Sequence, residues 1–269
     1  MRITVNGHGT YCYTGGKAFD AAKPTVVFIH GVLNDHSVWA LQSRYFANHG
    51  WNVLALDLPG HCRSEGDAPE SVEQAAGFIA ALLDAAGVAR AALVGHSWGS
   101  LIALEAAARL QDRITHLVLV GTAYPMKVSP ALIESALNTP EKALRMVNVF
   151  SRSTLASPSG AGFWAYGAGM ALGRRVLRSN PAVNVFHRGF LACDRYAGGE
   201  AAIAQITCPV LFALGAHDQM TNPKAAQGLI AAARAAGKAV QVANLPVGHH
   251  QMTEAPDATL FAIRDFLAA

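Results

Sequence analysis

The stretch that decides the fold is "LVGHSWGSLIALEAA", residues 93–107. An apolar run stops at Gly95, a serine follows, and a helical pattern begins at once. A chain that passes directly from strand to helix must turn sharply, which forces the central residue into strained backbone geometry. Gly95 and Gly99 flank Ser97 because larger side chains would clash there. The pattern therefore predicts an elbow that holds the Ser97 hydroxyl at the end of a strand.

Such an elbow places the hydroxyl where a nucleophile is useful. It aims the N-terminus of the new helix, with its free N–H groups, at the negative charge that develops during attack. A serine is a poor nucleophile at neutral pH and needs a base. The partners that accompany this kind of elbow follow in the chain order Ser, Asp, His.

Short apolar runs recur on both sides of the elbow, and helical patterns fill most of the intervals. Nearly continuous apolar character is typical of strands that are buried on both faces. The expected strands are 25–30, 52–57, 91–95, 116–121, 209–215 and 239–245, and the expected helices are 37–49, 71–86, 98–111, 223–236 and 257–268. The alternation predicts an α/β fold with a mostly parallel, doubly wound sheet, preceded by an N-terminal strand pair.

One interval breaks the alternation. Residues 124–205 contain no comparable strand, and about 80 residues are too many for a structureless loop. We interpret this interval as a helical cap inserted over the carboxyl edge of the sheet. The core domain would then consist of residues 1–123 and 206–269.

Composition narrows the class of protein. Of the 269 residues, 52% are hydrophobic and 14% charged, which provides a core and excludes disorder. The net charge of +3 comes from scattered basic residues, and the short cluster 174–178 reads as a solvated helix face. No long basic stripe is present, so we do not expect nucleic-acid binding.

The cysteines and the apolar segments bear on location. The four cysteines show no CxxC spacing, and the first residues show no apolar leader, which together predict a cytoplasmic protein with reduced thiols. The uncharged stretch between Arg152 and Arg174 is interrupted by Ser, Pro and Gly. It predicts an apolar segment over a pocket and not a membrane span. The oligomeric state stays open.

Two downstream loops supply the partners of Ser97. Asp218 follows the strand 209–215 in "GAHDQMTNP", where turn residues behind it suit an acid that orients an imidazole. A simple Asx turn is the alternative, but the other place for such an acid, "TAYPMK" after 116–121, holds no carboxylate. In "NLPVGHHQMTEAP" two histidines are adjacent, and Gly248 allows a close approach that favours His249 over His250.

Two N–H donors are needed for the oxyanion of acyl transfer. The first is expected to be the amide of Trp98, just past the nucleophile. The second is expected in "HGVLND", residues 30–35, where we choose the Val32 amide with Leu33 behind it. Gly31 lets this chain turn, and His30 is expected to anchor the loop.

These residues resemble the α/β-hydrolase superfamily over nearly the whole chain. The motifs stand in family order: "HG" at 30–31, "DLPGHCRS" at 57–64, "GHSWGS" at 95–100, "GAHD" at 215–218 and "GHHQMTEAP" at 248–256. In relatives the last motif commonly reads G-H-x-x-x-x-E-x-P, which assigns the catalytic histidine to His249. The resemblance implies fold and triad, but the superfamily spans many substrates.

Departures from the family pattern narrow the choice of enzyme class within the superfamily. Ser97 argues against haloalkane dehalogenases and epoxide hydrolases, whose nucleophile is an Asp. The elbow resembles that of prolyl iminopeptidases, but their "HGGPG" loop is replaced here by "HGVLN". Cys62 stands where many relatives have Gly. It is either a bland substitution, without effect on function, or a thiol near the site that makes the enzyme sensitive to alkylation.

The predicted function is that of a serine esterase, or an enzyme acting on a lactone or thioester, whose substrate is a largely apolar small molecule. Ser97 attacks, His249 moves the proton, and Asp218 orients His249. No cofactor or metal is expected, since the histidines form no HxH or HExxH pattern. Two alternatives stay open: hydrolysis of a C–C bond in a ring-cleavage product, which needs a polar anchor for a carboxylate in the cap, and a receptor without turnover. The candidate pocket residues are Leu33, Phe150, Phe163, Trp164, Tyr166, Phe186 and Phe190.

Overall fold

The computed structural model describes residues 1–20, 22–153 and 165–269. Its centre is one sheet with the strand order β1-β2-β4-β3-β5-β6-β7-β8. The strands β3 to β8 pair in parallel, and β1 and β2 form an antiparallel edge. Their bounds are β1 Arg2–Val5, β2 His8–Tyr13, β3 Thr25–Ile29, β4 Asn52–Leu56, β5 Ala91–His96, β6 Ile114–Val120, β7 Val210–Gly215 and β8 Val240–Leu245. The expected parallel sheet and N-terminal strand pair are confirmed.

The apolar runs explain why the sheet is covered on both faces. Successive side chains of a strand point to opposite faces, and in β3 they join two different cores. Val27 and Ile29 pack with α2 (Val72–Ala85), α3 (Trp98–Leu110), α8 (Gly199–Gln205) and α9 (Gln227–Ala235). Val26 and Phe28 pack with α1 (Ala40–Asn48) and α11 (Pro256–Leu267). The doubly wound fold is therefore confirmed.

Short elements complete the core. The 3-10 helices η1 (His36–Trp39) and η3 (Pro223–Ala226) begin two of the expected helical stretches, η2 (Gln111–Arg113) follows α3, and α10 (Gln251–Glu254) precedes α11. At the start of α2 the Ser71 hydroxyl accepts a hydrogen bond from the Gln74 N–H at 3.1 Å. This N-cap explains why the helix begins at Val72.

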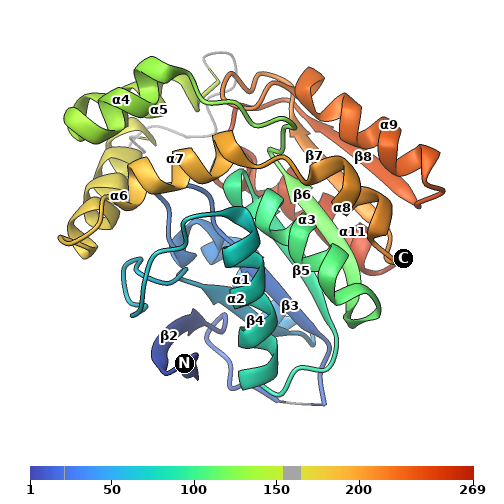
Figure 1. Ribbon diagram of the computed structural model, residues 1–269. Coiled ribbons are helices and arrows are strands. Elements are labelled where there is room, and N and C mark those ends of the chain that lie inside the picture. The colour runs from blue at the N-terminus through green and yellow to red at the C-terminus, as the bar shows by residue number, and fades with distance from the viewer. Residues whose placement is uncertain (21, 154–164) are drawn as a thin grey trace.

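The interval between β6 and β7 is helical wherever the structure describes it. It holds α4 (Pro130–Asn138), α5 (Pro140–Phe150), α6 (Ala165–Ser179) and α7 (Val185–Arg195), which lie together at the upper end of the view in Figure 1. A third apolar cluster, which includes Leu144, Val176 and Phe186, packs these helices together. The last helix of the interval, α8, instead contributes Ile203 to the core that includes α2 and α3. The division into core and cap stays a prediction.

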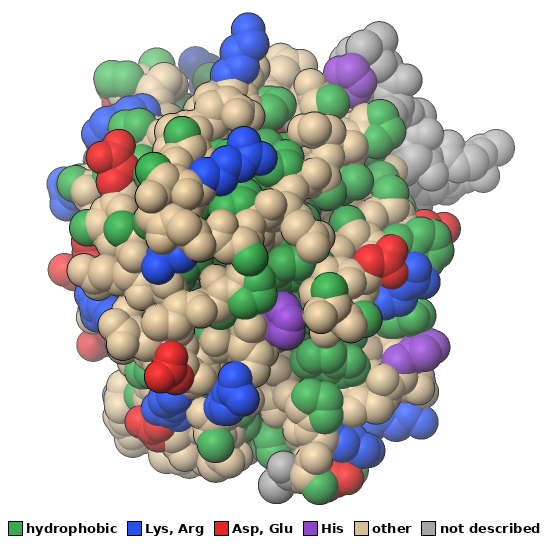
Figure 2. Space-filling model, turned by 90° about the vertical axis from the view of Figure 1, so that its right-hand side faces the viewer, with side chains coloured by type: hydrophobic (Ala, Val, Ile, Leu, Met, Phe, Trp, Pro, Cys, Tyr) green, Lys and Arg blue, Asp and Glu red, His purple; other side chains and the backbone are tan. Residues whose placement is uncertain are grey.

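The surface is mixed in character. On the face shown in Figure 2, basic side chains are interspersed with acidic and hydrophobic ones. In the basic cluster of α6, Arg174 pairs with Glu141 and Arg175 pairs with Asp35. Among the described residues no helix is both long enough and apolar enough to cross a membrane.

Candidate active site

The sharp turn expected between β5 and α3 is present, and Ser97 is at its apex. Ser97 has φ 54° and ψ −121°, a region that non-glycine residues rarely adopt. A Cβ atom on Gly95 would lie 2.0 Å from the Gly99 carbonyl oxygen, and one on Gly99 would lie 2.5 Å from the Ile29 carbonyl oxygen. Both glycines are therefore required for the close approach of helix, strand and turn.

Replacing Gly95 by alanine tests this packing. The added methyl would overlap backbone atoms that cannot move without shifting α3, so we expect a loss of more than about 3 kcal/mol in the free energy of unfolding. Urea denaturation measures the loss. Gly228→Ala in α9 is the matched control, because a Cβ there meets nothing within 4 Å. Equal stabilities of the two variants would contradict this account.

The loops after β7 and β8 bring Asp218 and His249 together. The Nδ1 atom of His249 lies 2.7 Å from Asp218 Oδ2, and both side chains are almost fully buried. A carboxylate only accepts, so Nδ1 carries the proton, and Nε2 is left unprotonated as an acceptor. The pair is thus arranged with the imidazole in the tautomer of a general base.

Thr221, which the sequence analysis missed, completes this arrangement. Its hydroxyl lies 2.7 Å from Asp218 Oδ2 and 3.0 Å from His249 Nδ1. The other Asp218 oxygen accepts the N–H groups of Met220 and Thr221, each at 2.8 Å. Burial by itself raises the pKa of Asp218, but His249 and these hydrogen bonds outweigh it and hold the pKa below its ordinary value. The carboxylate therefore stays charged at neutral pH.

Ser97 and His249 line one cavity of about 310 Å³. His250 lines a different, neighbouring cavity of about 270 Å³. The two adjacent histidines therefore line different cavities. The structure brings Ser97 and Asp218 together with His249 and not with His250.

Two groups, the Ser151 carbonyl and the Glu254 carboxylate, hold the His249 loop in place. The His249 N–H donates to the Ser151 carbonyl at 2.7 Å. Glu254 accepts the N–H groups of Gly248, Ser153 and His250 at 3.0–3.1 Å. This explains the Glu of the family motif, which closes the loop by binding its backbone.

His96, beside the nucleophile, supports the same loop. Its Nε2–H donates to the His249 carbonyl at 2.8 Å, and the two rings lie 4.7 Å apart. Complete burial, reinforced by the neighbouring His249, lowers the pKa of His96 to about 3. His96 is therefore neutral and adds no positive charge beside His249.

The two predicted oxyanion donors flank the nucleophile. Val32 lines the Ser97 cavity, and Trp98 is the first residue of α3. In the described part of the chain neither backbone N–H donates to another protein group. The sequence analysis expects Leu33 to line the same pocket. Leu33 lines the neighbouring 270 Å³ cavity instead, and its φ is 59°.

His30 anchors the loop that carries Val32, as the sequence analysis expected. Its Nδ1–H donates to the Gly31 carbonyl at 2.9 Å, and its Nε2 accepts the Leu58 N–H at 3.1 Å. The ring thereby ties the loop after β3 to the loop after β4. Burial lowers the pKa of His30, so the ring stays neutral in this role.

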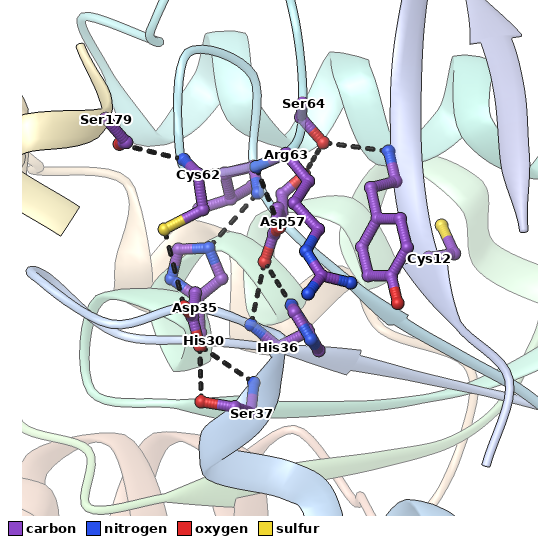
Figure 3. Close-up of polar contacts among 12 residues, drawn as sticks. Cys12, His30, Asp35, His36, Ser37, Asp57, Cys62, Arg63, Ser64 and Ser179 are labelled. Carbon is purple, nitrogen blue, oxygen red and sulfur yellow. Dashed lines mark hydrogen bonds and ion pairs between the residues drawn. The ribbon is translucent and has the colours of Figure 1, made fainter. Parts of the chain in front are cut away.

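Figure 3 shows Cys62 in the second of these loops. Its φ of 46° lies in the region that favours glycine, which explains the Gly of many relatives. Its thiol donates to Asp35 at 3.4 Å, and burial together with Asp35 raises the pKa of the thiol to about 12. Cys62 does not line the Ser97 cavity. These facts favour the bland substitution over an alkylation-sensitive thiol.

Asp35, His36 and Asp57 form the cluster in Figure 3 that resembles a set of metal ligands, with ligand atoms within 4.8 Å of one another. Each is already used. Asp57 accepts from His36 Nδ1 at 2.7 Å, and Asp35 accepts from Ser37 and from Arg175. Although burial opposes it, bonding to Ser37 and Arg175 holds the pKa of Asp35 at about 2. The cluster fixes the loops and leaves few free oxygens for an ion.

The candidate aromatic residues divide between two places. Phe150 and Phe190 line the Ser97 cavity. Phe186 and Tyr166 do not, because they pack within the apolar cluster of the upper helices. Phe163 and Trp164 lie outside the described residues. The sequence analysis missed further apolar lining residues: Met126, Val128, Leu132, Met146 and Met220.

Comparison with known proteins agrees with this architecture. Among curated relatives, the dihydrolipoyllysine-residue acetyltransferase component of the acetoin cleaving system of Cupriavidus necator is 37% identical over 112 residues, 41% of this chain and 28% of that protein. Epoxide hydrolase 3 of Xenopus tropicalis is 30% identical over 138 residues, 46% of this chain and 37% of that protein. The chain spans less than half the length of these relatives.

Solved structures and a family model extend the comparison to nearly the full chain. The crystal structure of the enol-lactonase from Burkholderia xenovorans covers 100% of both chains with a TM-score of 0.81 at 24% identity, which is a likeness of fold. The family model of the alpha/beta hydrolase fold matches residues 24–256. With that match over most of its length, the chain belongs to the alpha/beta hydrolase family.

Proposed function

We propose that this protein is a serine hydrolase that cleaves a carboxylic ester or lactone through an acyl-enzyme. The observation that carries the proposal is the 2.7 Å contact between His249 Nδ1 and Asp218 Oδ2. Asp218 holds the proton on Nδ1, and the imidazole lines the same cavity as Ser97. Its free Nε2 is then the base that a serine nucleophile needs.

The steps follow from this geometry. Ser97 Oγ attacks the carbonyl carbon while His249 Nε2 takes the hydroxyl proton. The N–H groups of Val32 and Trp98 stabilise the oxyanion. His249 then protonates the leaving alkoxide, and the acyl group remains on Ser97. A water molecule, deprotonated by His249, attacks the acyl-enzyme, and His249 returns the proton to Ser97 Oγ as the acid leaves.

The cavity indicates the substrate class. Its walls are mainly apolar, with Phe150, Phe190 and several methionines, although Lys127, Ser129 and Gln219 also line it. Its volume of about 310 Å³ suits a small acyl group. The fold neighbour that acts on an enol-lactone supports an ester-type bond. The serine at the elbow argues against an epoxide, for which relatives use an Asp.

A chain-length series of p-nitrophenyl esters tests the proposal. We expect turnover of the acetate and butyrate esters and a steep fall in kcat/KM at the laurate ester, which exceeds the cavity. A rapid burst of nitrophenolate, equal to the enzyme concentration, would report the acyl-enzyme. Absence of turnover on every ester, with folded protein, would overturn the proposal.

A further inference from the structure

Arg152, just after α5, is a half-buried cation, two of whose nitrogens have no hydrogen-bonding partner among the described residues. Its Nε and Nη1 atoms are fully buried, and neither has an acceptor in the described part of the chain. Leaving buried donors of a charged group unbonded costs several kcal/mol. Burial lowers the pKa of Arg152, and Glu254 opposes that shift. The free-energy cost of these unbonded donors indicates that a ligand supplies their acceptor.

Glu254 does not neutralise this cation by direct contact. Its two oxygens accept the backbone N–H groups of Gly248, Ser153 and His250. Among the ion pairs of the described residues none joins Arg152 to a carboxylate. The positive charge of Arg152 is therefore available to an anion.

The cavity that Arg152 lines suits such an anion. It has a volume of about 270 Å³, and its described walls contain no Asp or Glu. Its polar side chains include Asn34, Asn148 and His250. Asn34 is 5% exposed, its backbone N–H donates to the Gly31 carbonyl at 3.3 Å, and its side-chain amide has no hydrogen bond with the described residues. Arg175, the second arginine, is already bonded to Asp35 at 2.6 Å.

The ring of His250 faces Arg152, His96 and His249. Burial, with these neighbours, lowers the pKa of His250 well below its ordinary value, so the ring adds no second charge. One unpaired guanidinium and the Asn34 amide remain. This donor set matches a single carboxylate, which arginine binds through two oxygens.

The cavity adjoins the candidate active site. Val32 lines both this cavity and the one that holds Ser97. Phe150, two residues before Arg152, lines the Ser97 cavity. The cavity of Arg152 and the cavity of Ser97 are therefore neighbours that share Val32 as a wall.

We propose that Arg152 binds a carboxylate of the substrate, so that the preferred esters or lactones carry an acid group on the acyl or the alcohol side. This inference rests on the proposed function and narrows its substrate class.

The side of the cavity formed by α6 is tightly packed. A Cβ on Gly169 would lie 3.3 Å from Arg152 Nη2 and would collide with Asn148.

A pair of substrates tests the proposal. The mono-p-nitrophenyl ester of glutaric acid carries a free carboxylate, and p-nitrophenyl butyrate is its neutral counterpart. We expect wild type to prefer the glutarate ester. Arg152→Met is expected to lower the ratio of the two kcat/KM values about 10- to 100-fold, the range of a charge-assisted hydrogen bond. Arg178→Met, an exposed arginine outside this cavity, is the matched control and should leave the ratio unchanged.

Two outcomes would overturn the proposal. One is equal kcat/KM values of the two esters in wild type. The other is a parallel loss of both activities in Arg152→Met, which would mean that Arg152 only supports the His249 loop. If Arg152→Met does not fold, inhibition of wild-type butyrate hydrolysis decides: glutarate should compete and glutaramide should not. Equal inhibition by the two compounds would count against a carboxylate site.

Calorimetry with Ser97→Ala separates this proposal from the proposed function. Binding of glutarate and not of glutaramide, in a protein whose wild type hydrolyses no ester, would support the carboxylate site and reject the esterase. Turnover of neutral esters without any glutarate binding would support the esterase and reject the carboxylate site.

Discussion

Ser97→Ala is expected to lower kcat for p-nitrophenyl butyrate by at least about 10⁴-fold, because serine hydrolases that lose the nucleophile keep only the contribution of oxyanion stabilisation and binding. The elbow itself should persist. The substitution removes one oxygen from a half-buried position and keeps the backbone conformation of Ser97. Steady-state release of nitrophenolate measures the loss, and thermal denaturation reports whether the fold is intact.

A covalent probe provides the control for this variant. A fluorophosphonate should add one label per wild-type chain, on the peptide that contains Ser97, and none to Ser97→Ala. Labelling of the variant to the same extent, or retention of its activity within tenfold, would mean that another residue is the nucleophile. The acyl-enzyme mechanism would then be wrong.

His249→Ala is expected to lower kcat for the same neutral ester by about 10⁴-fold, since the base and later the acid of the reaction are both lost. His250→Ala is the matched control on the adjacent residue. His250 lines the other cavity, so its loss should cost less than tenfold. The comparison measures kcat for both variants at one pH and one substrate concentration well above KM.

The reverse result would be equally informative. If His250→Ala is the inactive variant, then the register of the loop after β8 differs from the one described, and His249 is not the base. Equal losses in both variants would indicate that the loop, rather than one imidazole, was disrupted.

The sheet and the elbow could be predicted because local sequence determines them. Each expected strand is present, with ends within two residues of the prediction. Buried strands need continuous apolar runs, and the turn at Ser97 needs Gly95 and Gly99, so both leave signals in short windows. The positions of Asp218 and His249 followed from the ends of strands, because carboxyl ends of parallel strands meet at one edge.

The cavity walls could not be predicted in the same way. Phe150 and Phe186 are both aromatic residues of the upper helices, yet one lines the Ser97 cavity and the other is completely buried. The difference depends on how the helices rotate against one another, which no short window encodes. Thr221 did leave a signal, since a threonine three residues after a strand-end Asp can bond back to it.

The hydrogen bond from the His249 N–H to the Ser151 carbonyl has a consequence for motion. It joins the loop of the base directly to the end of α5. Any opening that carries α5 away from the sheet must break this bond and the one between Ser153 and Glu254. By thermodynamic linkage, a ligand that favours the closed position of α5 also favours the ordered position of the imidazole, by the same free energy. Any movement of α5 is therefore coupled to the position of the His249 loop.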